Sequence, residues 1–82
     1  MKITYQNQEL KLRCRMREFM VFEKLNNGTP FEGDDSEDYV KLFFSSIICA
    51  LGYQPPLDDF LEFLKHNEDA LVEFVKENFK ID

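Results

Sequence analysis

The sequence predicts an α+β fold: an N-terminal β-hairpin followed by three or four short α-helices in a single small domain. Apolar residues alternate with period two in residues 2–14, whereas helical periodicity dominates from residue 16 onward. The 82 residues leave room for one core only. Because nine Phe and three Tyr are many for so small a core, we expect part of this apolar surface to be exposed and to bind another protein.

The hairpin is predicted to have strands at about 2–6 and 9–14. Between them lies a short polar segment, Gln6–Glu9, of the kind that forms tight turns. Asn7 tolerates the positive φ that such a turn requires. An isolated hairpin is only marginally stable in water, so one of its faces must pack on the helices.

Two helices are predicted next, at about 16–26 and 36–51. The first contains neither Gly nor Pro, and Asn27 and Gly28 then favour the left-handed conformation that stops a helix. The second follows acidic and Ser side chains at 34–36 that can cap its N-terminus. Its apolar residues recur at helical spacing and its opposite side is small and weakly polar, so we expect it to be buried on most sides.

Two more helices are predicted at about 57–66 and 68–80, with Asn67 placed to cap the fourth. The residues expected to face the core are Leu57, Phe60, Leu61 and Leu64 in the third helix, and Leu71, Val72, Val75 and Phe79 in the fourth. Phe63 and Phe74 lie about 100° away from those faces. They are candidates for an oligomer contact or a docking patch, although single exposed apolar residues are also common.

The net charge of −6 is unevenly distributed along the chain. Residues 1–24 hold six Lys or Arg and three Asp or Glu, whereas residues 25–82 hold four and thirteen. Since nucleic-acid-binding proteins normally present a net basic surface, this balance argues against a nucleic-acid partner. One short basic run is interpreted as a solvated face or as a set of internal ion-pair partners. It consists of Lys11, Arg13, Arg15 and Arg17.

The location of the protein is predicted from the segments that the sequence lacks. The chain opens with polar residues instead of a signal peptide. No stretch approaches the roughly 18 uncharged apolar residues that span a bilayer. We therefore expect a cytoplasmic protein with no membrane partner. Cys14 and Cys49 are far apart in sequence and are expected to be reduced thiols.

The sequence contains no recognisable constellation for catalysis or metal binding. His66 is the single histidine and, with two distant cysteines, does not make up a zinc site. The acidic cluster at 34–38 imitates the start of a calcium loop, but Tyr39 replaces the required Gly and Ser45 the required Glu. Helix capping explains this cluster better. We therefore expect no enzyme activity, no catalytic residue, no metal and no cofactor.

The first predicted helix carries apolar residues on two of its sides. One stripe consists of Met16, Phe19 and Met20, and the other of Val21, Phe22 and Leu25. Such a helix is either sandwiched between two layers, here the hairpin and the second helix, or presents one stripe to a partner. Met and Phe side chains together suit an adaptable hydrophobic groove that binds another protein.

Glu23 falls within the methionine stripe of this helix. A carboxylate at such a position needs an ionic partner or contact with solvent. Arg13 and Arg15, just upstream in the sequence, are the natural candidates for pairing with it. Glu23 is therefore predicted to contribute to stability or to partner binding.

Residues 12–31, LRCRMREFMVFEKLNNGTPF, and residues 38–43, DYVKLF, resemble the tail assembly chaperones of long-tailed bacteriophages and prophages. Members of that family open with a hairpin of the type K-I-x-Y…E-L-x-L. They continue with a helix of the type R-x-x-M-x-F-E-x-x-x-G-x-P-F, and their second helix starts in an acidic or Ser-rich cap. The similarity is sharpest over residues 10–31 and 38–51, and the C-terminal third is similar only in being acidic and helical.

The resemblance implies a chaperone that coats a phage tape measure protein, keeps its apolar helices soluble and delivers it to the tail tube protein. It also implies self-association. Two other functions are compatible with the residues. One is a small structural tail or connector protein, and the other is an acidic adapter or inhibitor that imitates nucleic acid.

Overall fold

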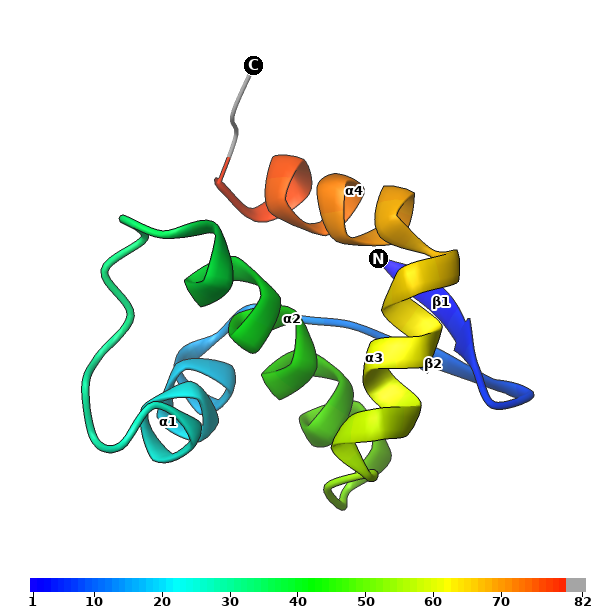
Figure 1. Ribbon diagram of the computed structural model, residues 1–82, viewed down its shortest axis with the longest axis horizontal. Coiled ribbons are helices and arrows are strands. Elements are labelled where there is room, and N and C mark those ends of the chain that lie inside the picture. The colour runs from blue at the N-terminus through cyan, green and yellow to red at the C-terminus, as the bar shows by residue number, and fades with distance from the viewer. Residues whose placement is uncertain (80–82) are drawn as a thin grey trace.

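The computed structural model describes residues 1–79, which form a two-stranded hairpin followed by four α-helices (Figure 1). In chain order the elements are β1 (Lys2–Tyr5), β2 (Gln8–Lys11), α1 (Met16–Leu25), α2 (Ser36–Leu51), α3 (Leu57–His66) and α4 (Glu68–Phe79). The predicted α+β fold is confirmed. The helices begin where the sequence predicts, and position 80 of the predicted fourth helix lies outside the described residues.

The strands β1 and β2 pair antiparallel across a two-residue turn. Both turn residues have positive φ, 48° at Gln6 and 66° at Asn7, which matches the twist of the strands on either side. The strands are shorter than predicted, because regular pairing stops near Lys11, although the Leu12 N–H still donates to the Met1 carbonyl at 2.7 Å. The buried face of the hairpin consists of Ile3, Tyr5, Leu10 and Leu12.

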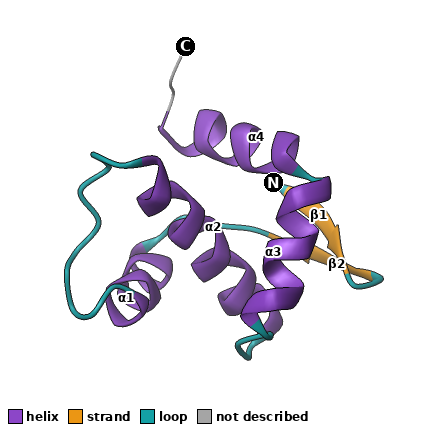
Figure 2. Ribbon diagram, in the orientation of Figure 1, coloured by secondary structure: helices purple, strands orange, loops and turns teal. Residues whose placement is uncertain are grey.

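The second helix, α2, lies at the centre of the molecule, with α1 on one side and α3 on the other (Figures 1 and 2). Its six residues from Leu42 to Ile47 are all buried, as expected for a helix covered on most sides. Asp35 caps it by accepting a hydrogen bond from the Glu37 N–H at 3.1 Å. Gly52 ends it in the left-handed conformation with a φ of 85°, which a residue with a side chain adopts only at a cost.

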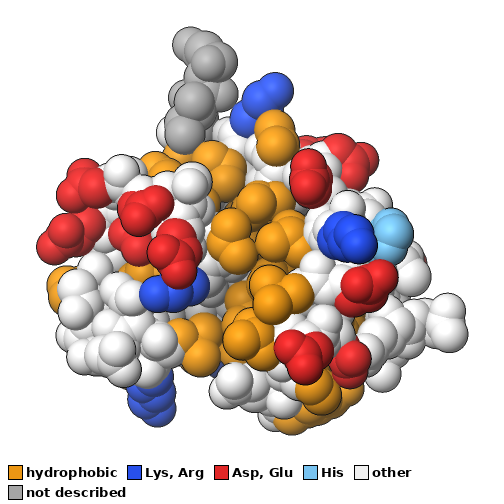
Figure 3. Space-filling model, viewed as in Figure 1, with side chains coloured by type: hydrophobic (Ala, Val, Ile, Leu, Met, Phe, Trp, Pro, Cys, Tyr) orange, Lys and Arg blue, Asp and Glu red, His pale blue; other side chains and the backbone are white. Residues whose placement is uncertain are grey.

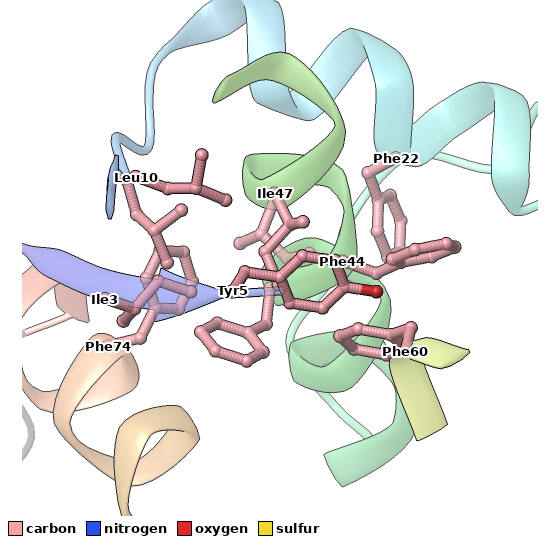
Figure 4. Close-up of a cluster of buried hydrophobic side chains, with 11 residues drawn as sticks. Ile3, Tyr5, Leu10, Phe22, Phe44, Ile47, Phe60 and Phe74 are labelled. Carbon is pink, nitrogen blue, oxygen red and sulfur yellow. The ribbon is translucent and has the colours of Figure 1, made fainter. Parts of the chain in front are cut away.

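Aromatic rings from every layer meet in the core beside α2 (Figure 4). The rings of Phe44 and Phe60 stack with their centroids 4.3 Å apart, and those of Phe43 and Phe74 lie 5.3 Å apart. All nine Phe belong to the described residues, and each of them is buried or partly buried. Phe side chains therefore contribute only in part to the exposed apolar surface that the sequence predicts. Met, Leu, Val and Tyr side chains are exposed in their place.

The faces that α3 and α4 turn to the core match the prediction only in part. Five of the predicted residues lie in the core or pack against it: Phe60, Leu64, Leu71, Val75 and Phe79. Leu57 and Leu61 are 55% and 47% exposed, and Val72 is also exposed. Phe74 is fully buried, and the partly buried Phe63 packs edge-on against Tyr5 with 4.9 Å between ring centroids. Both helices are rotated in this way because burying an aromatic ring removes more apolar area from water than burying a single aliphatic side chain.

Asn67 lies between α3 and α4, where the sequence predicts a cap for the fourth helix. Its side-chain amide instead donates a hydrogen bond to the carbonyl oxygen of Phe63 at 2.8 Å. The side chain thus satisfies a carbonyl at the C-terminal end of α3, which has no partner within the helix. Asn67 also stands at the start of α4, as predicted, where its backbone carbonyl accepts a hydrogen bond from the Ala70 N–H at 3.0 Å.

Candidate protein-binding groove

An open groove of about 230 Å³ lies between α1 and the loop that follows it. Four of the residues predicted to bind a partner line it: Met16, Phe19, Met20 and Glu23. Pro30 and Phe31 of the loop also line the groove. We call this set of six residues the α1 groove. The structure therefore brings the methionine stripe of α1 and the loop together in one site.

The two methionines of the α1 groove are the part of it most open to solvent. Met16 is 78% exposed and Met20 is 55% exposed, whereas Phe19 is partly buried. Of the two arrangements open to α1, the sandwich is therefore wrong for the methionine stripe. The opposite side of the helix, which carries Phe22, is covered by the core, and Phe19 packs against the core as well. Flexible thioether side chains can adapt their shape to a partner.

Phe31 fixes the loop wall of the α1 groove. Its ring centroid lies 5.3–5.5 Å from the centroids of four other rings. These rings belong to Phe19 and Phe22 of α1, Tyr39 of α2 and Phe79 of α4. The loop is held again at Gly33, whose carbonyl accepts a hydrogen bond from the Tyr39 hydroxyl at 3.2 Å. Tertiary packing thus holds this wall in place before any partner binds.

A buried carboxylate holds the N-terminal end of α1. The Glu18 side chain is 3% exposed, and its Oε1 accepts a hydrogen bond from the Arg15 N–H at 2.8 Å. The Arg15 Nε lies 3.9 Å from the same oxygen. Sequence reasoning missed Glu18, although an acidic residue three positions after the start of a helix is a known capping signal.

The other end of α1 is joined to α2. The Lys41 ammonium donates a hydrogen bond to the Asn26 side-chain oxygen at 2.9 Å. The Asn26 amide in turn donates to the Thr29 carbonyl at 3.3 Å. Both ends of the helix that carries the methionines are therefore fixed by polar contacts.

Glu23 does not make the ion pair that the sequence suggests. Arg15 contacts Glu18 instead, and Arg13 forms no ion pair with Glu23 within the described residues. Glu23 is partly buried and lines the α1 groove. Its carboxylate is thus the one acidic group among the residues of the groove.

Phe22 and Phe74 are not part of any surface. Both are 0% exposed and belong to the core, so the prediction that they contact a partner is wrong. Phe63 is partly buried against Tyr5 and does not form a shared patch with Phe74. The helical angle alone cannot distinguish an aromatic residue that faces a partner from one that has found a ring to pack on.

A second apolar surface lies over the other helices. Figure 3 shows a band of apolar side chains down the middle of one face, with acidic side chains on both sides of it. Leu57 and Leu61 are four residues apart on α3, and Val72 of α4 and Tyr53 of the connecting loop are exposed as well. Sequence reasoning missed this surface because it assigned Leu57, Leu61 and Val72 to the core.

The two thiols lie near Glu18. Burial, together with the negative charge of Glu18, raises the pKa of Cys14 to about 11. Burial and Glu18 raise the pKa of Cys49 as well, against an opposing effect of Arg17 and Arg15. Since the thiolate is the reactive form, both cysteines are poor nucleophiles at neutral pH.

Within residues 1–79, no three His, Cys, Asp or Glu side chains are grouped so that they could hold a metal ion. No helix in this part of the chain has the length and apolarity needed to cross a membrane. No protein-family model, curated protein or solved structure matches this chain.

Proposed function

We propose that this protein is a non-catalytic chaperone that binds apolar helical segments of another protein in the α1 groove. The observation that carries the proposal is the exposure of Met16 and Met20 at the rim of a groove whose far wall is already fixed. Burying an exposed methionine stabilises a complex by about 1.5–3 kcal/mol. A helix that covers both side chains would therefore gain affinity without requiring the protein to refold.

The chemistry of the groove specifies what kind of helix it would accept. An amphipathic helix lays apolar residues from successive turns into a groove of this type. Glu23 adds one acidic group without an ionic partner in the described part of the chain. A Lys or Arg beside the apolar stripe of the incoming helix would pair with it. The proposed ligand is thus an apolar helix with basic residues along one edge.

The resemblance to phage tail assembly chaperones supplies the identity that we propose for the partner. A tape measure protein is a long helical protein whose apolar segments need cover before the tail tube surrounds them. The acidic surface, visible on both sides of the apolar band in Figure 3, would keep such a complex soluble. We therefore propose the bacterial cytoplasm as the place of action and the tape measure protein as the partner.

The first test uses a synthetic 20-residue amphipathic helix with Leu at the core-facing positions and Lys at the flanks. We expect the Met16→Gln/Met20→Gln double variant to bind it at least about tenfold more weakly than the wild type, measured by fluorescence anisotropy. A Leu57→Gln/Leu61→Gln variant alters the second apolar surface by the same chemistry and serves as the control. If only the Leu57→Gln/Leu61→Gln variant lost binding, the α1 groove would be rejected as the binding site in favour of the apolar surface on α3.

The second test addresses the partner. Co-expression with the long helical protein encoded nearest to this chain should raise the soluble fraction of that protein. The Met16→Gln/Met20→Gln variant should not raise it. Mass spectrometry of purified phage particles then separates a chaperone from a structural tail protein, because a chaperone is absent from the finished particle. Its presence there in stoichiometric amounts would reject the chaperone function.

A further inference from the structure

A basic trough of about 250 Å³ lies between β2 and α2, separate from the α1 groove. Its basic side chains are Lys11, Arg13, Arg15 and Arg17. The first three are alternate residues of an extended segment, so they share one side, while Leu10 and Leu12 are buried on the other. The opposite wall is formed by Ser46, Cys49 and Ala50 of α2.

The backbone along the trough includes a free strand edge. The hairpin has only two strands. The backbone N–H of Leu12 points toward β1, since it donates a hydrogen bond to the Met1 carbonyl. Backbone groups alternate in direction along a strand, so those of Glu9 and Lys11 point away from β1. Arg13 points the same way, and its carbonyl accepts a hydrogen bond from the Ser46 hydroxyl at 2.8 Å. Within residues 1–79, the Glu9 and Lys11 backbone groups on this edge have no such partner.

The charges in the trough are only partly neutralised. The two acidic residues that line it each have a basic neighbour: Glu9 lies 3.5 Å from the Lys2 ammonium, and Glu18 contacts Arg15. No ion pair is formed by Lys11, Arg13 or Arg17 with any described residue. This concentration of positive charge stands in a protein whose net charge is −6.

We propose that the basic trough binds an acidic peptide segment of another protein, which adds in extended conformation to the edge of β2. The Glu9 and Lys11 backbone groups would supply the hydrogen bonds of a short added strand, and Lys11, Arg13 and Arg17 would pair with its carboxylates. The hydrogen bond from Ser46 to Arg13 closes one end of the edge, so the added strand spans only a few residues.

A second copy of this chain is the less suitable occupant. The acidic residues of α2, α3 and α4 lie within helices. The acidic loop before α2 is held by the packed Phe31 ring, by the hydrogen bond from Tyr39 to Gly33 and by the capping contact of Asp35. Among the described residues, no acidic segment is thus free to form an added strand. A separate protein with an unstructured acidic segment would supply both the carboxylates for the basic side chains and the extended backbone for the strand edge. This inference does not depend on the α1 groove or on its apolar ligand.

The test uses an acetylated and amidated peptide of alternating Glu and Thr, seven residues long. We expect binding that weakens steeply with salt and protects the Glu9 and Lys11 amides from hydrogen exchange. The Leu12 amide, already bonded to Met1, serves as the internal reference. The Lys11→Gln/Arg13→Gln variant should bind at least about tenfold more weakly, whereas a Lys65→Gln/Lys76→Gln variant, altered at exposed sites on α3 and α4, should bind within about twofold of wild type.

The same peptide with N-methyl groups at alternate backbone positions keeps its charge but loses the donors for strand pairing. Equal binding of the two peptides would overturn the added strand. Salt-sensitive self-association of the protein that is lost in Lys11→Gln/Arg13→Gln, with no peptide binding, would overturn the proposal in favour of a second copy.

Discussion

The buried Glu18 carboxylate accepts a hydrogen bond from the Arg15 backbone N–H at 2.8 Å. This contact satisfies a donor at the start of α1 that has no partner within the helix. Glu18 also lines the basic trough, whereas Met16, on the same first turn, lines the α1 groove. One capping contact thus supports the position of two separate surfaces.

Replacing Glu18 should destabilise the protein. Glu18→Ala removes the cap and leaves the Arg15 N–H without its acceptor, so we expect a loss of about 1–3 kcal/mol in the free energy of unfolding. Urea denaturation measures this change. Glu23→Ala, a matched substitution on the same helix, removes no ion pair found among residues 1–79 and should change stability by less than about 0.5 kcal/mol. Equal losses in the two variants would contradict the capping role.

The Tyr5 hydroxyl is buried and has no hydrogen-bond partner among the described residues (Figure 4). Because a buried hydroxyl without a partner costs about 1–3 kcal/mol, Tyr5→Phe should leave the melting temperature unchanged or raise it. Tyr39→Phe is the control, since it removes the hydrogen bond to Gly33 and should lower the melting temperature. A clear loss of stability in Tyr5→Phe would indicate a bound water at this hydroxyl.

Gly33 is expected to tolerate no side chain. Its φ is +75°, and an added Cβ would lie 3.1 Å from the Tyr39 hydroxyl oxygen. Gly33→Ala should therefore lower stability by more than about 1 kcal/mol and weaken binding in the α1 groove. Gly28→Ala has a similar φ of +84° but open space around the Cβ, so it reports backbone strain alone. Thermal unfolding of both variants separates backbone strain from steric contact. Equal losses of stability in the two variants would show that the contact between the added Cβ and Tyr39 has no energetic cost.

The Cys14 thiol should make stability depend on alkaline pH. Burial raises its pKa from 9.0 to about 11, so the folded state holds the proton more tightly than the unfolded state. The resulting stability is present below pH 9 and is lost as the pH rises toward 11. Cys14→Ala should remove this component from the pH dependence of urea unfolding. In the folded protein, alkylation of Cys14 by iodoacetamide at pH 9 should be about tenfold or more slower than in urea.

Sequence patterns predicted the backbone better than the surfaces. The alternation in residues 2–14 and the polar turn at Asn7 correctly predicted the hairpin. The apolar spacing in residues 36–51 correctly predicted the central helix. These signals are local, so no knowledge of the tertiary structure is needed to interpret them. The methionine stripe was predicted for the same reason, because it lies on one face of one helix.

The inward faces of α3 and α4 could be predicted only in part in this way. Phe74 is buried because it meets Phe43, which lies in another helix and far away in sequence. The same rotation of α4 leaves Val72 exposed. Likewise, the partner of Arg15 depends on which nearby carboxylate the fold buries, and the sequence alone favoured Glu23 over Glu18.

The packing of Phe31 has a kinetic consequence for recognition. Its ring touches rings from three helices, so the wall it supports exists before a ligand arrives. Little conformational entropy remains to be lost on association. Complex formation should then follow a single bimolecular step whose rate rises linearly with ligand concentration, and differences between ligands should lie mainly in how fast they dissociate.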